Sequence, residues 1–164
     1  MKALRVGHSL DKVIDMGAVV SEEQKKAIEE YVESAIAEGA DVFQIPAPEK
    51  GCFYPPTLIT GVNTASRVVE EEIFGPVLVA LPFRTAKEAI SIANNTIYGL
   101  AASVHTEQLT LALETAKNIK AGTVWINCHN IFDAAAGYNR YFTFFIWANR
   151  LQVPNQQMDF FQVC

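Results

Sequence analysis

The clearest pattern of apolar positions follows Ser21, where apolar and polar residues alternate with the period of an α-helix. Ser21 and Gln24, three places apart, have the residue types of a capping box, and Gly39 is a typical stop signal. The apolar members fall on one stripe, made of Ala27, Ile28, Tyr31, Val32, Ala35 and Ile36. The pattern predicts an amphipathic helix that buries one face.

Two further helices are predicted by the same periodicity. Thr85 and Glu88 form a second capping box, ahead of an apolar stripe made of Ala86, Ala89, Ile90 and Ala93. Residues 108–119 come before Gly122 and carry a third stripe, made of Leu109, Leu111, Ala112, Leu113 and Ala116.

Short apolar runs bounded by glycine, proline and polar residues predict strands over 41–45, 57–62, 77–83, 100–104 and 123–127. The last three alternate with the two later helices. Parallel strands need crossover connections of this kind. We therefore expect an α/β fold, a largely parallel open sheet with helices on both faces.

The pattern changes after Gly137. Residues 138–147, YNRYFTFFIW, are crowded with aromatic side chains and show no clear period, and the remaining residues are largely polar. We expect residues 1–137 to form the folded part of the chain and residues 138–164 to be a divergent, poorly ordered tail.

Composition narrows the class of partner. Half of the 164 residues are hydrophobic, and the length fits one globular domain. The net charge of −5 and the scattered basic residues argue against a nucleic-acid or anionic-membrane surface, and the apolar run 142–148 is too short to span a bilayer. The chain has three cysteines, Cys52, Cys128 and Cys164, which form no CxxC motif and no even-numbered disulfide framework. This pattern favours free thiols in a reducing compartment, and hence a cytoplasmic protein.

No catalytic group emerges from the usual nucleophiles. Cys128 precedes His129, but neighbouring side chains on a strand point to opposite faces, so a structural thiol is the better interpretation. Ser103 and His105 share a strand face, yet the sequence lacks the GxSxG elbow of a hydrolase. No Cys/His cluster has the spacing of metal ligands and no GxGxxG loop is present, so we expect no metal site and no complete dinucleotide site.

The acidic run at residues 70–72 offers the remaining polar candidates. Three adjacent carboxylates repel one another, so at least one needs a partner or water. A solvated acidic run is one interpretation. The abrupt change to IFGPV favours another, because it places Glu72 and Phe74 at the mouth of a buried strand in a fold class that binds ligands at strand ends.

The motifs around this stretch closely resemble those of the aldehyde dehydrogenase superfamily. In chain order they are RVGHSLDKVIDMGAVVSEEQ, GCFYPPTLI, EEIFGPVLVALPF, NNTIYGLAASVHT and GTVWINCHN. The resemblance runs from about Leu4 to Gly137, and the segment SLDKVIDMGAVV is most similar to the family-16 aldehyde dehydrogenases. It implies that residues 1–137 are the C-terminal part of the catalytic domain, in a fragment or truncated isoform.

This resemblance implies NAD- or NADP-dependent oxidation of a small aldehyde to a carboxylic acid by a homo-oligomeric enzyme. Glu72 resembles the carboxylate that holds the nicotinamide-ribose hydroxyls, and Phe74 resembles the ring that packs near the nicotinamide. The family's nucleophilic cysteine, general-base glutamate, oxyanion-hole asparagine and Rossmann half would all precede Met1, and Cys128 does not match the nucleophile. We therefore expect the isolated chain to be inactive, with no catalytic residue of its own.

Two rival interpretations remain. One is a non-catalytic scaffold or interaction module built on the aldehyde dehydrogenase fold. The other is a free-standing hydrolase that uses Ser103 and His105, which the missing elbow disfavours. After Gly137 the sequence also departs from the glycine-rich loop and subunit-pairing strand with which the family usually continues.

Overall fold

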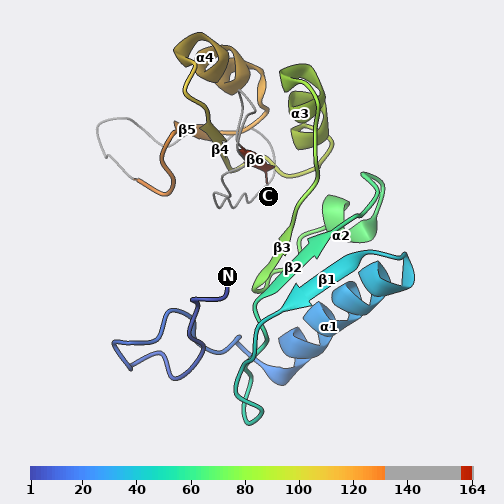
Figure 1. Cartoon of the computed structure of the whole chain (residues 1–164), viewed down its shortest axis with the longest axis vertical. Coiled ribbons are helices and arrows are strands. Elements are labelled where there is room, and N and C mark those ends of the chain that lie inside the picture. Colours follow the sequence, from blue (N-terminus) through green and yellow to red (C-terminus); the bar gives the residue numbers. More distant parts are fainter. Residues whose placement is uncertain (132–159, 164) are drawn as a thin grey trace. The chain divides into compact units, whose positions relative to one another are not determined.

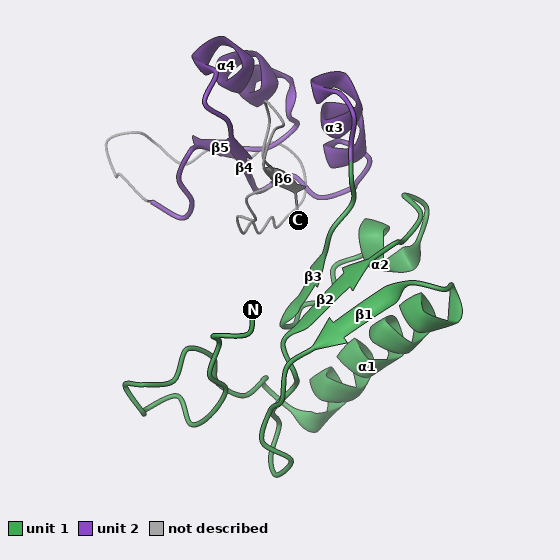
Figure 2. Ribbon diagram, in the orientation of Figure 1, with its two compact units in different colours: residues 1–82 green, residues 83–164 purple. Residues whose placement is uncertain are grey.

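The computed structural model describes residues 1–131 and 160–163 (Figure 1). The chain divides into two compact units, residues 1–82 and residues 83–164, and each combines helices with a three-stranded sheet (Figure 2). No helix in the described part of the chain is long and apolar enough to cross a membrane. Most of the tail predicted for residues 138–164 lies outside the described residues, so that prediction stays untested.

Unit 1 is residues 1–82. Its elements are α1 (Glu22–Ala37), β1 (Asp41–Gln44), β2 (Thr57–Thr60), α2 (Arg67–Glu70) and β3 (Val77–Val79). The strands lie in the order β1-β2-β3, with β1 antiparallel to β2 and β2 parallel to β3. Helix α1 runs alongside this sheet (Figure 1), and the buried core draws on helices, sheet and loops: Ile28, Val32, Ala35, Tyr54, Ile59, Val68 and Ile73.

Helix α1 begins and ends where the capping signals predict. The Ser21 Oγ accepts a hydrogen bond from the backbone N–H of Gln24 at 3.2 Å. Gly39 takes a positive φ of 91° after the last turn. Ile36, which the periodicity placed on the apolar stripe, is 55 % exposed. The buried face is therefore narrower at the end of the helix than predicted.

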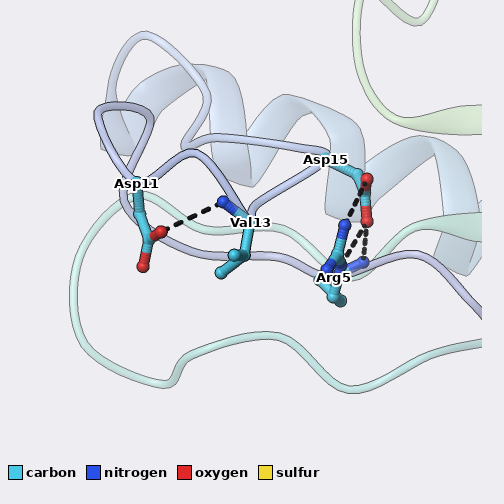
Figure 3. A network of polar contacts seen from close by, with 4 residues as sticks. All are labelled: Arg5, Asp11, Val13 and Asp15. Carbon is cyan, nitrogen blue, oxygen red and sulfur yellow. Dashed lines mark hydrogen bonds and ion pairs between the residues drawn. The ribbon is translucent and has the colours of Figure 1, made fainter.

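A loop over residues 5–16 precedes α1. The Arg5 guanidinium donates to both carboxylate oxygens of Asp15, at 2.9 and 3.1 Å, and the Arg5 backbone N–H donates to the same carboxylate at 2.9 Å (Figure 3). These hydrogen bonds lower the pKa of Asp15 to about 2. Asp11 Oδ1 accepts a bond from the Val13 N–H at 3.1 Å. The ion pair between Arg5 and Asp15 joins the two ends of the loop, and the bond between Asp11 and Val13 stabilises a tight turn within it.

Unit 2 is residues 83–164. Its elements are α3 (Ala86–Ala93), β4 (Ala101–His105), α4 (Leu109–Asn118), β5 (Thr123–Ile126) and β6 (Phe160–Val163). The strands lie in the order β5-β4-β6, with β4 parallel to β5 and antiparallel to β6. Residues 101–104 of β4 are all buried. The predicted strand-helix-strand unit is therefore present as β4-α4-β5.

The α/β class is confirmed, with differences in how the strands pair. Strand β1 is antiparallel to β2 because residues 45–56, which connect them, hold four prolines and no helix that could carry out a parallel crossover. The strand predicted over 77–83 ends at Val79, short of Pro82, whose nitrogen has no hydrogen to donate to a ladder. Strand β3 pairs in unit 1 and β4 pairs in unit 2, so the predicted run of five elements is divided between two sheets.

Candidate functional site

The candidate site is the loop of residues 71–76, which joins α2 to β3. The Glu71 N–H donates to the carbonyl of the first residue of α2 at 2.9 Å, and the Thr57 N–H on β2 donates to the Pro76 carbonyl at 2.9 Å. Between these ends, the Ile73 side chain is buried in the core of unit 1. The loop is therefore anchored at both ends and in its middle.

Gln24, in the first turn of α1, holds the backbone of this loop from the side. Its Nε2 donates to the carbonyl of Ile73 at 3.3 Å and to the carbonyl of Phe74 at 3.1 Å. Gly75 then passes close to the same helix: a Cβ at this position would lie 2.7 Å from Cγ1 of Ile28. The capping-box pattern pointed to Gln24, but no signal in the sequence indicated this second contact.

Phe74 combines an unusual backbone with an exposed ring. Its φ of 54° lies in the left-handed region that residues other than glycine rarely adopt, and the residue is 65 % exposed. Strain of this kind costs about 1–3 kcal/mol and clusters at ligand-binding sites and clamps. The bonds from Gln24 hold the strained backbone in place.

The two neighbouring carboxylates of the loop have opposite environments. Glu71 is exposed, and it accepts hydrogen bonds from the Tyr31 hydroxyl at 2.7 Å and from Arg67 Nε at 2.8 Å. The bond from Tyr31, and then the bond from Arg67, lower the pKa of Glu71. Glu72 is half-buried, and burial raises its pKa. A carboxylate perturbed by burial beside an exposed ring is typical of a ligand-binding position.

A second polar pair lies in unit 2. The Ser103 Oγ and His129 Nδ1 are 2.8 Å apart, and the His129 ring meets Trp125 edge-on with 5.0 Å between ring centroids. Burial lowers the pKa of His129. The partner of Ser103 is thus His129, whereas the strand pattern suggested His105. The reason is that β5 ends at Ile126 and the chain leaves strand geometry there, so positions after it no longer alternate between faces.

This pair lacks the exposure that a hydrolase needs. Ser103 is 1 % exposed, so a substrate carbonyl has no path to its hydroxyl. This burial favours a structural role for the serine. Its hydrogen bond to His129 joins β4 to the segment that follows β5.

Cys52 does not offer an activated thiolate. The Cys52 Sγ donates to a Glu22 carboxylate oxygen at 3.3 Å, and this bond raises the pKa of the thiol. Cys128 is half-buried, and Cys164 lies outside the described residues. No group of three or more His, Cys, Asp or Glu residues in the described part of the chain is arranged to hold a metal ion.

Comparison with known proteins places these features in one family. The family model for the aldehyde dehydrogenase family matches residues 1–140. An aldehyde dehydrogenase of Agaricus bisporus is 40 % identical over 143 residues, which are 86 % of this chain and 29 % of that protein. The chain therefore spans less than a third of the length of such relatives. The finer similarity to family 16 stays a prediction.

Solved structures agree with the sequence comparison. Betaine aldehyde dehydrogenase from Staphylococcus aureus in complex with NAD+ matches with a TM-score of 0.80 and 39 % identity, over 86 % of this chain and 29 % of that one. An aldehyde dehydrogenase from Bacillus cereus, the E194S mutant, matches with a TM-score of 0.79 and 42 % identity, over 85 % of this chain and 29 % of that one. The motifs, the fold and the matched region together show that this chain belongs to the aldehyde dehydrogenase family.

Proposed function

We propose that residues 71–76 supply part of the nicotinamide-binding site of an enzyme that oxidises a small aldehyde to a carboxylic acid with NAD. In this proposal Glu72 accepts hydrogen bonds from the ribose hydroxyls next to the nicotinamide, and Phe74 packs against the nicotinamide. The observation that carries it is the geometry of the loop: the half-buried Glu72 stands two residues before the exposed Phe74 ring, whose left-handed backbone is held by Gln24.

The residues fit such a cofactor on physical grounds. A carboxylate can accept two hydroxyl donors at once, and charge-assisted bonds of this kind are stronger than neutral ones. A planar ring held exposed on a strained backbone offers a flat apolar surface to another ring. Both groups would contact the nicotinamide half of the molecule, which is identical in NAD and NADP. The NAD+ complex of the Staphylococcus aureus relative favours NAD.

The chain's own contribution is binding and orientation. The cofactor, when bound, supplies a hydride acceptor for the aldehyde. Glu72 and Phe74 would fix the direction of its nicotinamide end, and Gln24 would keep both at a constant position through the loop backbone. Holding reactants in one orientation is a large part of catalysis, and this is the part that these residues can perform.

A titration with nicotinamide mononucleotide tests the binding proposal. The ¹⁵N-labelled chain is expected to show saturable shifts of the amide signals of residues 72–75. Glu72→Gln is expected to weaken binding about tenfold, because it removes hydrogen bonds to a charged acceptor. Glu30→Gln, which removes an exposed carboxylate from α1, is the matched control and should bind as the wild type does.

Two outcomes contradict the proposal. One is a Glu72→Gln variant that binds as tightly as the wild type. The other is a wild type without saturable shifts, which would instead favour the non-catalytic scaffold.

The 164 residues alone are proposed to be inactive, since the bond to Glu22 raises the pKa of the Cys52 thiol and Cys128 does not match the family's nucleophilic cysteine. The assay combines purified chain, excess NAD and small aldehydes. Turnover above that of a heat-treated control would contradict inactivity, without bearing on the binding site. We also propose the cytoplasm as the location, where thiols such as Cys52 and Cys128 stay reduced.

A further inference from the structure

Three side chains form a closed triangle beside the candidate site. Tyr31 comes from α1, Arg67 opens α2, and Glu71 caps the C-terminal end of α2. One carboxylate oxygen of Glu71 accepts the Tyr31 hydroxyl at 2.7 Å and the Arg67 Nε–H at 2.8 Å. The Arg67 guanidinium carbon also lies 4.1 Å from the centre of the Tyr31 ring, in cation–π geometry. Each member therefore contacts the other two.

The backbone of Glu71 connects this triangle to Glu72. Glu71 has φ −104° and ψ 152°, an extended conformation. Successive side chains of extended backbone point to opposite sides. A Glu71 side chain fastened to Tyr31 and Arg67 on the exposed side therefore turns the next side chain the other way, and Glu72 is half-buried as this requires.

We propose that Tyr31, Arg67 and Glu71 form a positioning clasp that sets the direction of Glu72 and Phe74 for the cofactor. This inference rests on the proposed function of those two residues. The clasp fixes the start of the loop, and Gln24 fixes the carbonyls of the next two residues, so the backbone around Glu72 is held from both sides. None of the three clasp residues needs to touch the cofactor.

The clasp also acts through charge. Two adjacent ionised carboxylates repel each other, and a half-buried one is disfavoured further by the loss of water. Arg67 neutralises Glu71 directly, at 2.8 Å, and so removes much of that repulsion. The ionised form of Glu72 is the one that accepts two hydroxyl hydrogens, so a smaller repulsion from Glu71 favours binding of the ribose.

Stability is not where the clasp should have its main effect. The side chains of Arg67 and Glu71 are 47 % and 48 % exposed, and ion pairs this exposed contribute little to folding. The effect is expected instead in the order of the loop and in the affinity for the nicotinamide group. That separation distinguishes a positioning role from a structural one.

The test uses the full chain and nicotinamide mononucleotide as the probe. Tyr31→Phe removes only the hydroxyl and keeps the ring under Arg67. Without ligand, it should speed amide hydrogen exchange of residues 72–75 about tenfold, the scale of one hydrogen bond to a charged group. The affinity for the mononucleotide should fall by a similar factor. Ser34→Ala, which removes from α1 a half-buried hydroxyl that donates to Glu38, is the matched control and should change neither.

A second series keeps the proposal testable if one variant folds poorly. Glu71→Gln retains an oxygen that accepts from Tyr31 but loses the charge, whereas Glu71→Ala loses both. The expected order of affinity is wild type, then Glu71→Gln, then Glu71→Ala, with thermal midpoints nearly unchanged. The positioning role is overturned if all three proteins bind with equal affinity. It is also overturned if affinity falls only in proportion to the fall in the thermal midpoint.

Failure of the clasp and failure of the proposed function give different results. If the wild type binds the mononucleotide, Glu72→Gln binds it more weakly, and Tyr31→Phe binds and exchanges like the wild type, the clasp alone is wrong. If the wild type shows no saturable binding, the proposed function is wrong and the inference falls with it.

Discussion

Replacing Gly75 with alanine tests whether the loop at residues 71–76 depends on close contact with α1. Alanine adds a single Cβ, which would lie 2.7 Å from Cγ1 of Ile28, inside the 3.0 Å that real Cβ atoms keep. Ile28 is 0 % exposed, so it cannot swing into water. The φ of Gly75 is not in the left-handed region, so the cost is steric. Overpacking by one methyl group in a core costs about 1–3 kcal/mol.

The assay is thermal unfolding followed by circular dichroism, with urea unfolding as a second measure. A loss of 1 kcal/mol lowers the Tm of a domain of this size by about 4–8 °C, so Gly75→Ala should lower the Tm of unit 1 by roughly 4 °C or more. In an Ile28→Val background the loss should be smaller, because valine lacks the Cδ1 that also meets the added Cβ. Both backgrounds are needed because Ile28→Val itself costs about 0.5–1.5 kcal/mol.

Gly39→Ala provides the control for the double-mutant cycle. A Cβ at Gly39 would meet no atom within 4 Å, but its φ of 91° strains alanine. Its cost of about 1 kcal/mol should therefore be the same in both Ile28 backgrounds. The reasoning is refuted if Gly75→Ala leaves the Tm unchanged. It is also refuted if Gly75→Ala, like Gly39→Ala, lowers the Tm by the same amount with isoleucine and with valine at position 28.

Three further predictions concern titratable groups. Burial raises the pKa of Glu72, so ionisation of this carboxyl group opposes folding. The contribution of Glu72 to the stability of unit 1 is therefore favourable at low pH and is lost as the pH rises. Glu72→Gln should stabilise unit 1 at neutral pH, as measured by urea unfolding. Burial lowers the pKa of His129 from 6.5, so the contribution of this group to the stability of unit 2 should be fully present above that pH and should decrease as the pH falls below it; His129→Gln should remove this dependence, and an unchanged profile would contradict it. Asp15 should titrate at about 2 by carboxyl NMR, and Arg5→Gln should return it toward 3.8; a titration near 3.8 in the wild type would show that the Arg5 bonds do not persist.

Three of the four helices in the described residues, α1, α3 and α4, could be predicted because their signals are local, whereas the single turn of α2 was not predicted. Ser21 caps α1 and Thr85 caps α3, each through the hydrogen bond that the capping-box spacing implies. Strand pairing could not be predicted in the same way, since it depends on contacts between distant segments. The antiparallel pairing of β1 with β2 follows from the kind of connection between them, which the periodicity of either strand does not contain.

The candidate site was predictable only in part. Glu72 and Phe74 were identified through a motif, and their role in cofactor binding stays a prediction. The supports around them arise from packing of α1 against the loop, 49 residues away in sequence between Gln24 and Ile73. The pairing of Ser103 with His129 depends on the path of the chain after β5 ends at Ile126, which the alternation of strand positions does not contain.

Gln24 carries two functions on one residue, since its backbone N–H completes the first turn of α1 and its side chain holds the loop. Fraying of that turn would therefore release the carbonyls of Ile73 and Phe74 at the same time. Thermodynamic linkage makes the relation reciprocal: a ligand that binds only the ordered loop must also suppress opening of the helix end. The rate of amide exchange in the first turn of α1, which does not contact the ligand, should therefore report how much of the loop has ligand bound.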